Sequence, residues 1–159
     1  MSKHRHEHLS GERPESHRDQ TILMVAFFAI WIIDSFLLRI TTFLWVMDYF
    51  YVYLGLGAVV LLIAVYFMNA SHKDLFDTRV EGLATIGVFG RVRHPMYLGT
   101  HLFYLGLALV TFSLASIVMW VIIFAFYNML ANYEERLLED RFGEEFLKYK
   151  RDVRKWIPL

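Results

Sequence analysis

The stretch HPMYLGTHLFYLGLALVTFSLASIVMWVIIFAFYNMLANY, residues 94–133, contains no Asp, Glu, Lys or Arg over 40 residues. As an α-helix it would extend about 60 Å, twice the roughly 30 Å of a bilayer's hydrocarbon core. We therefore interpret it as two membrane-spanning helices. The turn-like break at Ser113 to Ser116 predicts a tight hairpin between spans over about 96–112 and 114–132. Pro95 favours a helix start because its missing N–H has no partner to lose there.

Two further apolar segments precede this hairpin. They predict spans over about 21–46 and 49–70, with Asp48 marking the turn between them. After the hairpin, charged cytoplasmic helices are predicted over about 133–151, with a break at Gly143. Residues 21–159 are then one domain, an all-α integral membrane protein with four transmembrane helices and C-terminal amphipathic helices.

The ends and the charges fit this topology. Residues 1–20 are polar and rich in histidine, and we interpret them as a disordered, solvated tail without a metal site. Four spans place 15 of the 16 Lys and Arg on one face, all but Arg39. The positive-inside rule makes that face cytoplasmic, together with both termini. The net charge of zero gives no sign of a nucleic-acid partner, and the absence of cysteine excludes disulfides and a thiolate nucleophile.

Two polar faces are predicted to meet at the cytoplasmic end of the hairpin. On the third span, one helical face carries a run of imidazoles and phenols: His94, Tyr97, His101 and Tyr104. On the fourth span, one face carries Asn128, Asn132 and Glu135, with Glu134 and Tyr127 on the adjacent stripe. Polar groups at this depth are costly unless they face protein or a cavity. We therefore predict a polar pocket between the two spans.

The pocket would suit a ligand with a carboxylate, an ammonium and a sulfonium. The N-terminus of the third span and Arg91 and Arg93 favour the carboxylate, Glu134 and Glu135 favour the ammonium, and aromatic rings attract cations. S-adenosylmethionine has these groups, and a zwitterionic lipid headgroup shares some of them. Each residue also has a plain structural alternative, since His94 is placed to cap a helix and His101 to pack in a core.

Two sequence blocks resemble a known family. The first is GVFGRVRHPMYLG, residues 87–99, and the second is EERLL, residues 134–138, followed by FGEEF at 142–146 and by Tyr149. Together they resemble the isoprenylcysteine carboxyl methyltransferases and the related membrane phospholipid and small-thiol methyltransferases. The resemblance covers about Glu81 to Pro158. It implies an S-adenosylmethionine site lined by Glu81, Gly82, Leu83, Ala84, Phe89, His94, Pro95, Met96, Tyr97 and Glu134.

One position departs from the family. Eukaryotic isoprenylcysteine enzymes carry an Arg four residues before the first Glu, assigned to the substrate carboxylate, and here that position is Leu130. Arg136, Arg93 or Arg39 would have to replace it. Our candidate catalytic residues are Arg93 and, as the general base that an amine or thiol acceptor needs, His101 or His94.

The predicted function is S-adenosylmethionine-dependent methyl transfer to a lipophilic acceptor in the bilayer. An isoprenylcysteine-like carboxylate, a lipid amine and a small thiol all remain open as acceptors. Two alternatives belong to other classes. One is an NAD(P)H-dependent membrane reductase of the sterol or enone type, which shares the Arg-His-Pro-x-Tyr block. The other is a non-enzymatic four-helix membrane protein. Asp34, inside the first span, is a candidate for function or for a structural pair with another span, and the sequence carries no sign of an oligomeric state.

Overall fold

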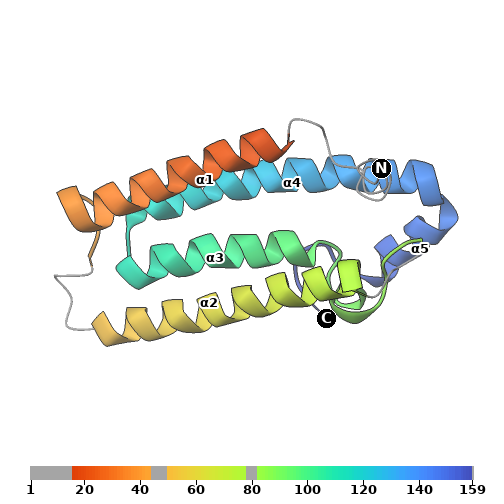
Figure 1. The fold of residues 1–159 in the computed structure, drawn as a ribbon, viewed down its shortest axis with the longest axis horizontal. Helices are drawn as coiled ribbons and strands as arrows, with labels where there is room; N and C mark the ends of the chain where they lie inside the picture. The colour runs from red at the N-terminus through yellow and green to blue at the C-terminus, as the bar shows by residue number, and fades with distance from the viewer. Residues whose placement is uncertain (1–15, 44–49, 78–81, 159) are drawn as a thin grey trace.

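The computed structural model describes residues 16–43, 50–77 and 82–158, which fold as four long helices with a short fifth helix at one end (Figure 1). The long helices are α1 (Ser16–Ile32), α2 (Phe50–His72), α3 (Pro95–Thr111) and α4 (Leu114–Phe142), and the short one is α5 (Glu144–Asp152). Single turns of π- and 3-10-helix form η1 (Ile33–Leu38), η2 (Lys73–Asp77) and η3 (Gly87–Gly90). In space α1 packs on α4, α4 on α3, and α3 on α2.

Three of the helical segments are long and apolar enough to cross a membrane. They are Ser16–Leu38 with 23 residues, Phe50–Leu75 with 26 and Leu114–Phe142 with 29. Helix α3 has 17 residues, which is about 26 Å and slightly short of a roughly 30 Å hydrocarbon core. Many large apolar side chains point outward, such as Leu37 and Leu62, which are 69% and 71% exposed. Such a surface suits lipid and not water.

The helix boundaries correct two predictions. Helix α1 begins at Ser16, so Ser16 to Gln20 belong to it and not to the polar tail predicted over residues 1–20. Polar residues continue the helix here because Asp19 in its first turn interacts favourably with the helix dipole. The helical segment that begins with α1 ends at Leu38, where Arg39 adopts the left-handed conformation, so the first span stops short of the predicted residue 46. The rest of the predicted tail and the turn at Asp48 lie outside the described residues.

The hairpin and the C-terminal break lie where the sequence predicts them. Helix α3 ends with Phe112 in the left-handed conformation, φ 45°, and the Ser113 side chain caps α4 by accepting from the Ser116 N–H at 3.1 Å. Helix α4 then runs without interruption from the apolar segment into the charged one. Gly143, with φ 52°, separates α4 from α5.

Helices α2 and α3 form the tightest pair in the bundle. Buried small residues recur every seven positions on both, at Gly57, Ala64 and Ser71 of α2 and at Gly99 and Gly106 of α3. Gly57 lies against Gly106, and Gly99 lies against Ala64. A Cβ atom added to Gly57 would lie 2.5 Å from Val110 Cγ2 and 2.8 Å from its backbone N. Small residues allow this close backbone approach, which drives helix association where lipid removes the hydrophobic effect.

The contacts of α1, α3 and α4 are made by large side chains. Phe27, Tyr104, Met119, Ile123 and Tyr127 form a buried cluster between the three helices. The rings of Phe27 and Tyr104 lie 4.6 Å apart between centroids. Tyr104 therefore points into the α1 interface, and not with His94 and Tyr97 into the polar pocket predicted between α3 and α4.

A polar network holds α1 to the α3–α4 hairpin. Asp34 is 6% exposed and accepts from the Thr41 N–H and hydroxyl, both at 2.8 Å, and from the Ser113 hydroxyl at 2.5 Å. Beside it, the Ser35 hydroxyl donates to Thr111 at 2.9 Å. These contacts favour the structural role for Asp34, because its carboxylate oxygens are engaged by neighbouring segments.

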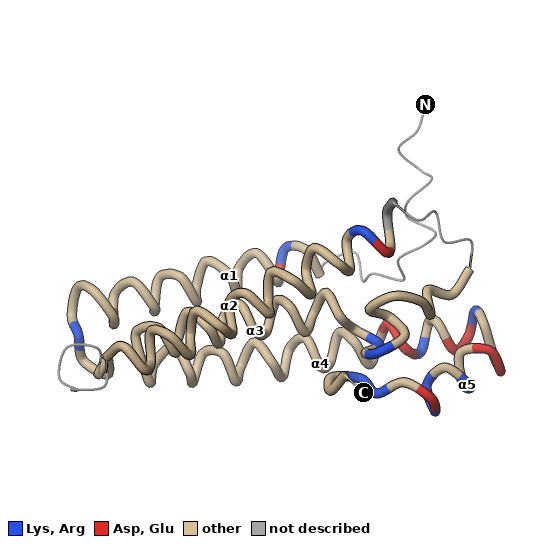
Figure 2. The backbone as a smooth tube through the Cα atoms, turned by 90° about the horizontal axis from the view of Figure 1, so that it is seen from below, with Lys and Arg blue, Asp and Glu red and all other residues tan. Residues whose placement is uncertain are grey.

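The opposite end of the bundle carries most of the charge. Figure 2 shows acidic and basic residues gathered where α4 ends and α5 packs beside it. The starts of α1 and α3 and the ends of α2 and α4 lie at this same end (Figure 1). We call it the charged end.

Gly57→Ala tests the close packing of α2 on α3. The added methyl group would overlap Val110, so we expect the variant to lose about 1–3 kcal/mol of stability. Gly55→Ala is the matched control, since nothing lies within 4 Å of a Cβ there. Melting temperatures in the same detergent compare the two, and equal melting temperatures would contradict the packing.

Candidate functional site

The charged end is built around a buried carboxylate. Glu135 of α4 is 4% exposed, and its Oε1 atom lies 3.0 Å from Arg93 Nη2, 3.2 Å from His94 Nε2 and 3.7 Å from Lys155 Nζ. Its Oε2 atom lies 3.6 Å from Lys150 Nζ. We call these five residues the Glu135 cluster. A carboxylate can be buried only with such partners, so the cluster holds three separate segments of the chain together.

Arg93 joins the loop before α3 to the C-terminal segment. Its Nη1 donates to the carbonyls of Lys150 at 3.0 Å and Val153 at 2.6 Å, while its Nε donates to Glu135 at 3.1 Å. Its backbone N–H donates to the Arg154 carbonyl at 2.9 Å. The guanidinium fork is thus engaged within the chain, which gives Arg93 the geometry of a positioning residue.

Glu134 lies beside this cluster on a different stripe of α4. Its carboxylate accepts a hydrogen bond from the Tyr97 hydroxyl, and its Oε2 atom lies 3.6 Å from His94 Nδ1. The rings of His94 and Tyr97 are parallel, with centroids 5.7 Å apart. The structure therefore brings together three residues from the two sequence blocks, on the N-terminal end of α3 and the charged part of α4. The side chain of Glu134 is 16% exposed, against 6% for that of Glu135.

His94 is held as a neutral imidazole near pH 7. Burial lowers the pKa of His94 below its ordinary 6.5, although the hydrogen bond to Glu135 opposes the shift. A neutral ring has one donor and one acceptor nitrogen, so it can donate through Nε2 to Glu135 at 3.2 Å but cannot also donate to Glu134.

His101 occupies an aromatic enclosure one level deeper. Its ring lies 4.9 Å from Phe124, 5.2 Å from Tyr127 and 5.3 Å from Trp156, between centroids. The residue is 3% exposed, and neither ring nitrogen has a hydrogen-bond partner in the described structure. An unpartnered buried imidazole is costly. His101 lies near the site because its ring and that of His94 both contact Trp156, but it makes no hydrogen bond to the Glu135 cluster.

The other predicted cofactor residues lie around this end. Pro95 and Met96 form the first turn of α3. The Phe89 carbonyl, in η3, accepts from the Tyr149 hydroxyl at 2.7 Å, and Leu83 packs on Phe146 and Tyr149. Gly82 and Ala84 are in the same described loop, Gly82 with φ 111°. Glu81 lies outside the described residues.

The C-terminal segment supplies contacts that the sequence analysis did not assign to the site. Lys150 and Lys155 contact Glu135. Trp156 donates to Asn128 Oδ1 at 3.2 Å and packs against His94 with ring centroids 5.8 Å apart. The signal in the sequence was Trp156 and the run of basic residues before it, whose charges we used for the topology alone.

Comparison with known proteins identifies relatives of this chain. Residues 20–145 match the family of phospholipid methyltransferases. Protein-S-isoprenylcysteine O-methyltransferase A of Arabidopsis thaliana is 27% identical over 72% of this chain and 60% of its own length. The Saccharomyces cerevisiae protein-S-isoprenylcysteine O-methyltransferase is 29% identical over 65% of this chain and 45% of its own length. The chain thus spans about half the length of these relatives.

The fold has a counterpart among solved structures. The structure of the eukaryotic intramembrane Ras methyltransferase, isoprenylcysteine carboxyl methyltransferase, aligns with a TM-score of 0.52 at 22% identity. The alignment covers 89% of this chain and 53% of that one. Together with the apolar helices, this likeness makes the chain an integral, multi-pass membrane protein.

Glu135→Ala tests the role of the cluster in holding the C-terminal segment. Removing one partner of a buried ionic network costs about 3–5 kcal/mol, and the loss of the anion leaves Arg93, Lys150 and Lys155 facing one another. We expect a lower melting temperature and faster tryptic cleavage at the Lys and Arg residues of the segment that follows Gly143. Glu139→Ala is the control, because the side chain of Glu139 is 42% exposed and forms its ion pair in the described structure with Lys150. Equal cleavage rates in the two variants would show that the Glu135 cluster does not hold the C-terminal segment.

His94→Gln tests the protonation state of the imidazole. Because the pKa of His94 lies below 6.5 in the folded protein, the unfolded chain takes up the proton first as the pH falls. This part of the stability is present above pH 6.5 and is lost as the pH falls through and below that value. We expect the melting temperature of the wild type to fall more between pH 7.5 and 5.5 than that of the variant. Melting temperatures that fall equally with pH in the wild type and the variant would show that His94 does not contribute to the pH dependence of stability.

Proposed function

Since this chain belongs to the phospholipid methyltransferase family, we propose that it transfers a methyl group from S-adenosylmethionine to a lipid-attached acceptor in the membrane. The relatives are named as protein-S-isoprenylcysteine O-methyltransferases, which supports methyl transfer over the reductase and non-enzymatic alternatives. The observation that carries the proposal is the Glu134 carboxylate, held by Tyr97 and His94 at the N-terminal end of α3.

The residues present fit the proposed cofactor. The N-terminus of α3 presents backbone N–H groups without intrahelical partners and the positive end of a helix dipole, which favour a carboxylate. Glu134 offers an anion for the ammonium group, and the rings of Tyr97 and Trp156, which lie beside His94, would offer aromatic surface to a cation. His94, Pro95, Met96, Tyr97 and Glu134, with the loop residues Glu81, Gly82, Leu83, Ala84 and Phe89, are the proposed cofactor-binding set.

The residues of the chain would act mainly by binding and orientation. S-adenosylmethionine supplies an electrophilic methyl group on a sulfonium when it is bound. Alignment of two reactants and exclusion of water account for large rate effects in such transfers. The Glu135 cluster, through Arg93, fixes the C-terminal segment over the site. A carboxylate acceptor needs no base, and for an amine or thiol acceptor we retain His101 as the proposed base, because its nitrogens have no partner in the described structure.

We further propose that all four long helices cross the membrane, with the charged end and both termini in the cytoplasm. Helix α3 is within a few ångström of the hydrocarbon thickness, and its packing against α2 keeps it at the depth of its neighbour. The basic residues concentrated at the charged end support a cytoplasmic face (Figure 2). A methyl donor from the cytoplasm would then reach Glu134 directly.

Glu134→Ala tests the proposed cofactor site. Loss of a charged hydrogen-bonding partner costs about 1.5–3 kcal/mol, so we expect the dissociation constant for S-adenosylhomocysteine to rise about 10- to 100-fold. Calorimetric titration of detergent-purified protein gives this constant. Asp140→Ala is the matched control, because it removes an exposed carboxylate from the same helix. Equal affinities in both variants, or binding of NADPH in place of S-adenosylhomocysteine, would overturn the proposal.

A further inference from the structure

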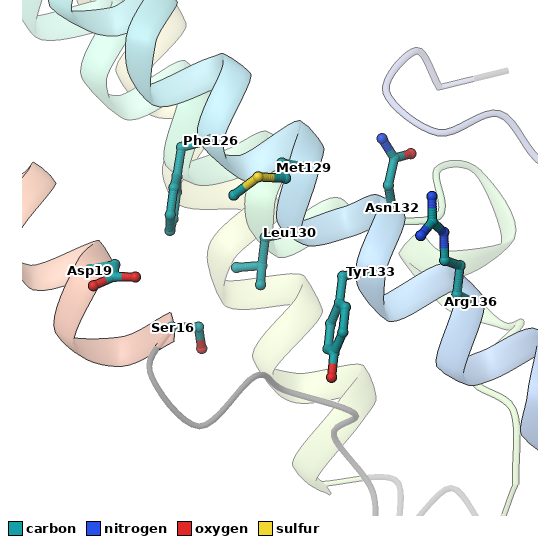
Figure 3. Close-up of a pocket in the computed structure, with 8 residues that line it drawn as sticks. All are labelled: Ser16, Asp19, Phe126, Met129, Leu130, Asn132, Tyr133 and Arg136. Atoms are coloured by element: carbon teal, nitrogen blue, oxygen red, sulfur yellow. The ribbon is translucent and has the colours of Figure 1, made fainter.

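A cavity of about 230 Å³ lies between the start of α1 and the charged part of α4. Figure 3 shows its wall, in which Ser16 and Asp19 of α1 face Phe126 and Tyr133 of α4. None of the residues that line this cavity belongs to the proposed cofactor set. That set lies instead on the loop before α3, on the first turn of α3 and at Glu134, so the shape of the donor site depends on how the loop is held.

The loop before α3 contains the short turn η3 (Gly87–Gly90), which needs a hydrogen-bond acceptor from outside the loop. The turn is closed by the N–H groups of Phe89 and Arg91, which donate to the carbonyls of Ile86 and Val88, each at 3.1 Å. The N–H of Val88 lies at the start of the turn, where backbone donors have no acceptor within the helix. Val88 is 4% exposed, so water does not readily supply the missing acceptor.

Asp74, in η2 at the end of α2, supplies this acceptor. Its Oδ2 atom accepts from the Val88 N–H at 2.8 Å. The same carboxylate lies so close to Gly87 that a Cβ atom there would overlap it. Gly87 also has a φ of 62°, in the left-handed region that glycine adopts most readily. Asp74 and Gly87 therefore fit each other, because the missing side chain at Gly87 lets the carboxylate reach the next N–H along the chain.

The turn that Asp74 contacts is also joined to the C-terminal part of the chain. The Phe89 carbonyl accepts from the Tyr149 hydroxyl of α5 at 2.7 Å, and the Arg93 N–H donates to a carbonyl of the segment after α5 at 2.9 Å. His94 follows directly and caps the start of α3. The loop is therefore held from three sides, and Asp74 is the residue that holds it from the end of α2.

We propose that Asp74 is a positioning residue for the methyl donor, which acts through the backbone of η3 and not by contact with the donor. Because α2 packs closely on α3, Asp74 ties the loop to the same pair of helices that carries His94 and Tyr97. Without this hydrogen bond the loop residues of the cofactor set would lose their fixed place relative to α3, and the donor would bind less tightly. The inference rests on the proposed function, and it gives a role to a residue outside the two sequence blocks that resemble the family.

Calorimetric titration of the detergent-purified, full-length protein with S-adenosylhomocysteine tests this role in three variants. Asp74→Ala removes the acceptor of a buried N–H, so we expect the dissociation constant to rise about 10-fold. Asp74→Asn keeps an acceptor oxygen and removes the charge, and we expect its constant to stay within about threefold of the wild type. Asp140→Ala is the matched control, because it removes an exposed carboxylate at the same end of the protein, and we expect a change of less than about twofold.

Hydrogen–deuterium exchange without ligand reports on the loop directly. We expect residues 87–93 to exchange faster in Asp74→Ala than in the wild type, because an amide that has lost its acceptor opens more readily. In Asp74→Asn the same residues are expected to exchange at the wild-type rate. The α3–α4 hairpin is expected to exchange equally in all of these proteins, which shows that Asp74→Ala is folded.

Three results would overturn the inference. The first is equal affinity for S-adenosylhomocysteine in the wild type and Asp74→Ala, and the second is equal exchange of residues 87–93 in these two proteins. The third is binding by Asp74→Asn as weak as that by Asp74→Ala, which would mean that the charge of Asp74 acts on the donor itself. Failure of the proposed function looks different, because the wild type would then not bind S-adenosylhomocysteine, while faster exchange in Asp74→Ala would still show that Asp74 holds the loop.

Discussion

The burial of one carboxylate, Glu135, sets the arrangement of the whole charged end. Its charge can leave water only because the loop before α3 and the C-terminal segment bring cations to it. Arg93 then uses its remaining donors on the carbonyls that follow α5. One residue of α4 thereby fixes segments that are far apart in the sequence. His94 belongs both to this cluster and to the proposed cofactor set, and it also contacts Glu134, so the position of the candidate site depends on the Glu135 cluster.

The opposite end of the bundle also holds a buried carboxylate, but the groups that pair with it are of a different chemical kind. Asp34 is buried there, and its partners among the described residues are hydroxyl and amide groups and not cations. These donors come from the chain just after η1 and from the α3–α4 turn, so the network ties α1 to the hairpin. A membrane protein must pair its polar groups internally. In this chain a buried carboxylate pairs with polar groups of neighbouring segments at each end of the bundle, and the apolar middle is held by side-chain packing.

The sequence predicts most of the helix boundaries and part of the candidate site, because its strongest signals are local. The uncharged run from His94 to Tyr133, the break at Ser113 and the stop at Gly143 each report on a few neighbouring residues, and α3, α4 and α5 lie where those signals place them. The meeting of His94 and Tyr97 with the two Glu residues also followed from helical spacing. Three features did not. The extension of α1 to Ser16 has no apolar signal, the turn of Tyr104 toward Phe27 depends on where α1 packs, and the role of Lys150 and Lys155 depends on a chain reversal at Gly143.

The bundle has one closely packed interface, between α2 and α3, and a less closely packed region between α1, α3 and α4. Glycines bring the backbones of α2 and α3 into contact, which leaves little space between them and holds α3 firmly. Large aromatic side chains keep α1, α3 and α4 further apart, and the cavity at the start of α1 lies in this looser part. Under the proposed function, the closely packed α3 would orient the methyl donor, and the less closely packed interface would be the side from which a lipid-attached acceptor enters. The distribution of small and aromatic residues places these two kinds of interface on opposite sides of α3.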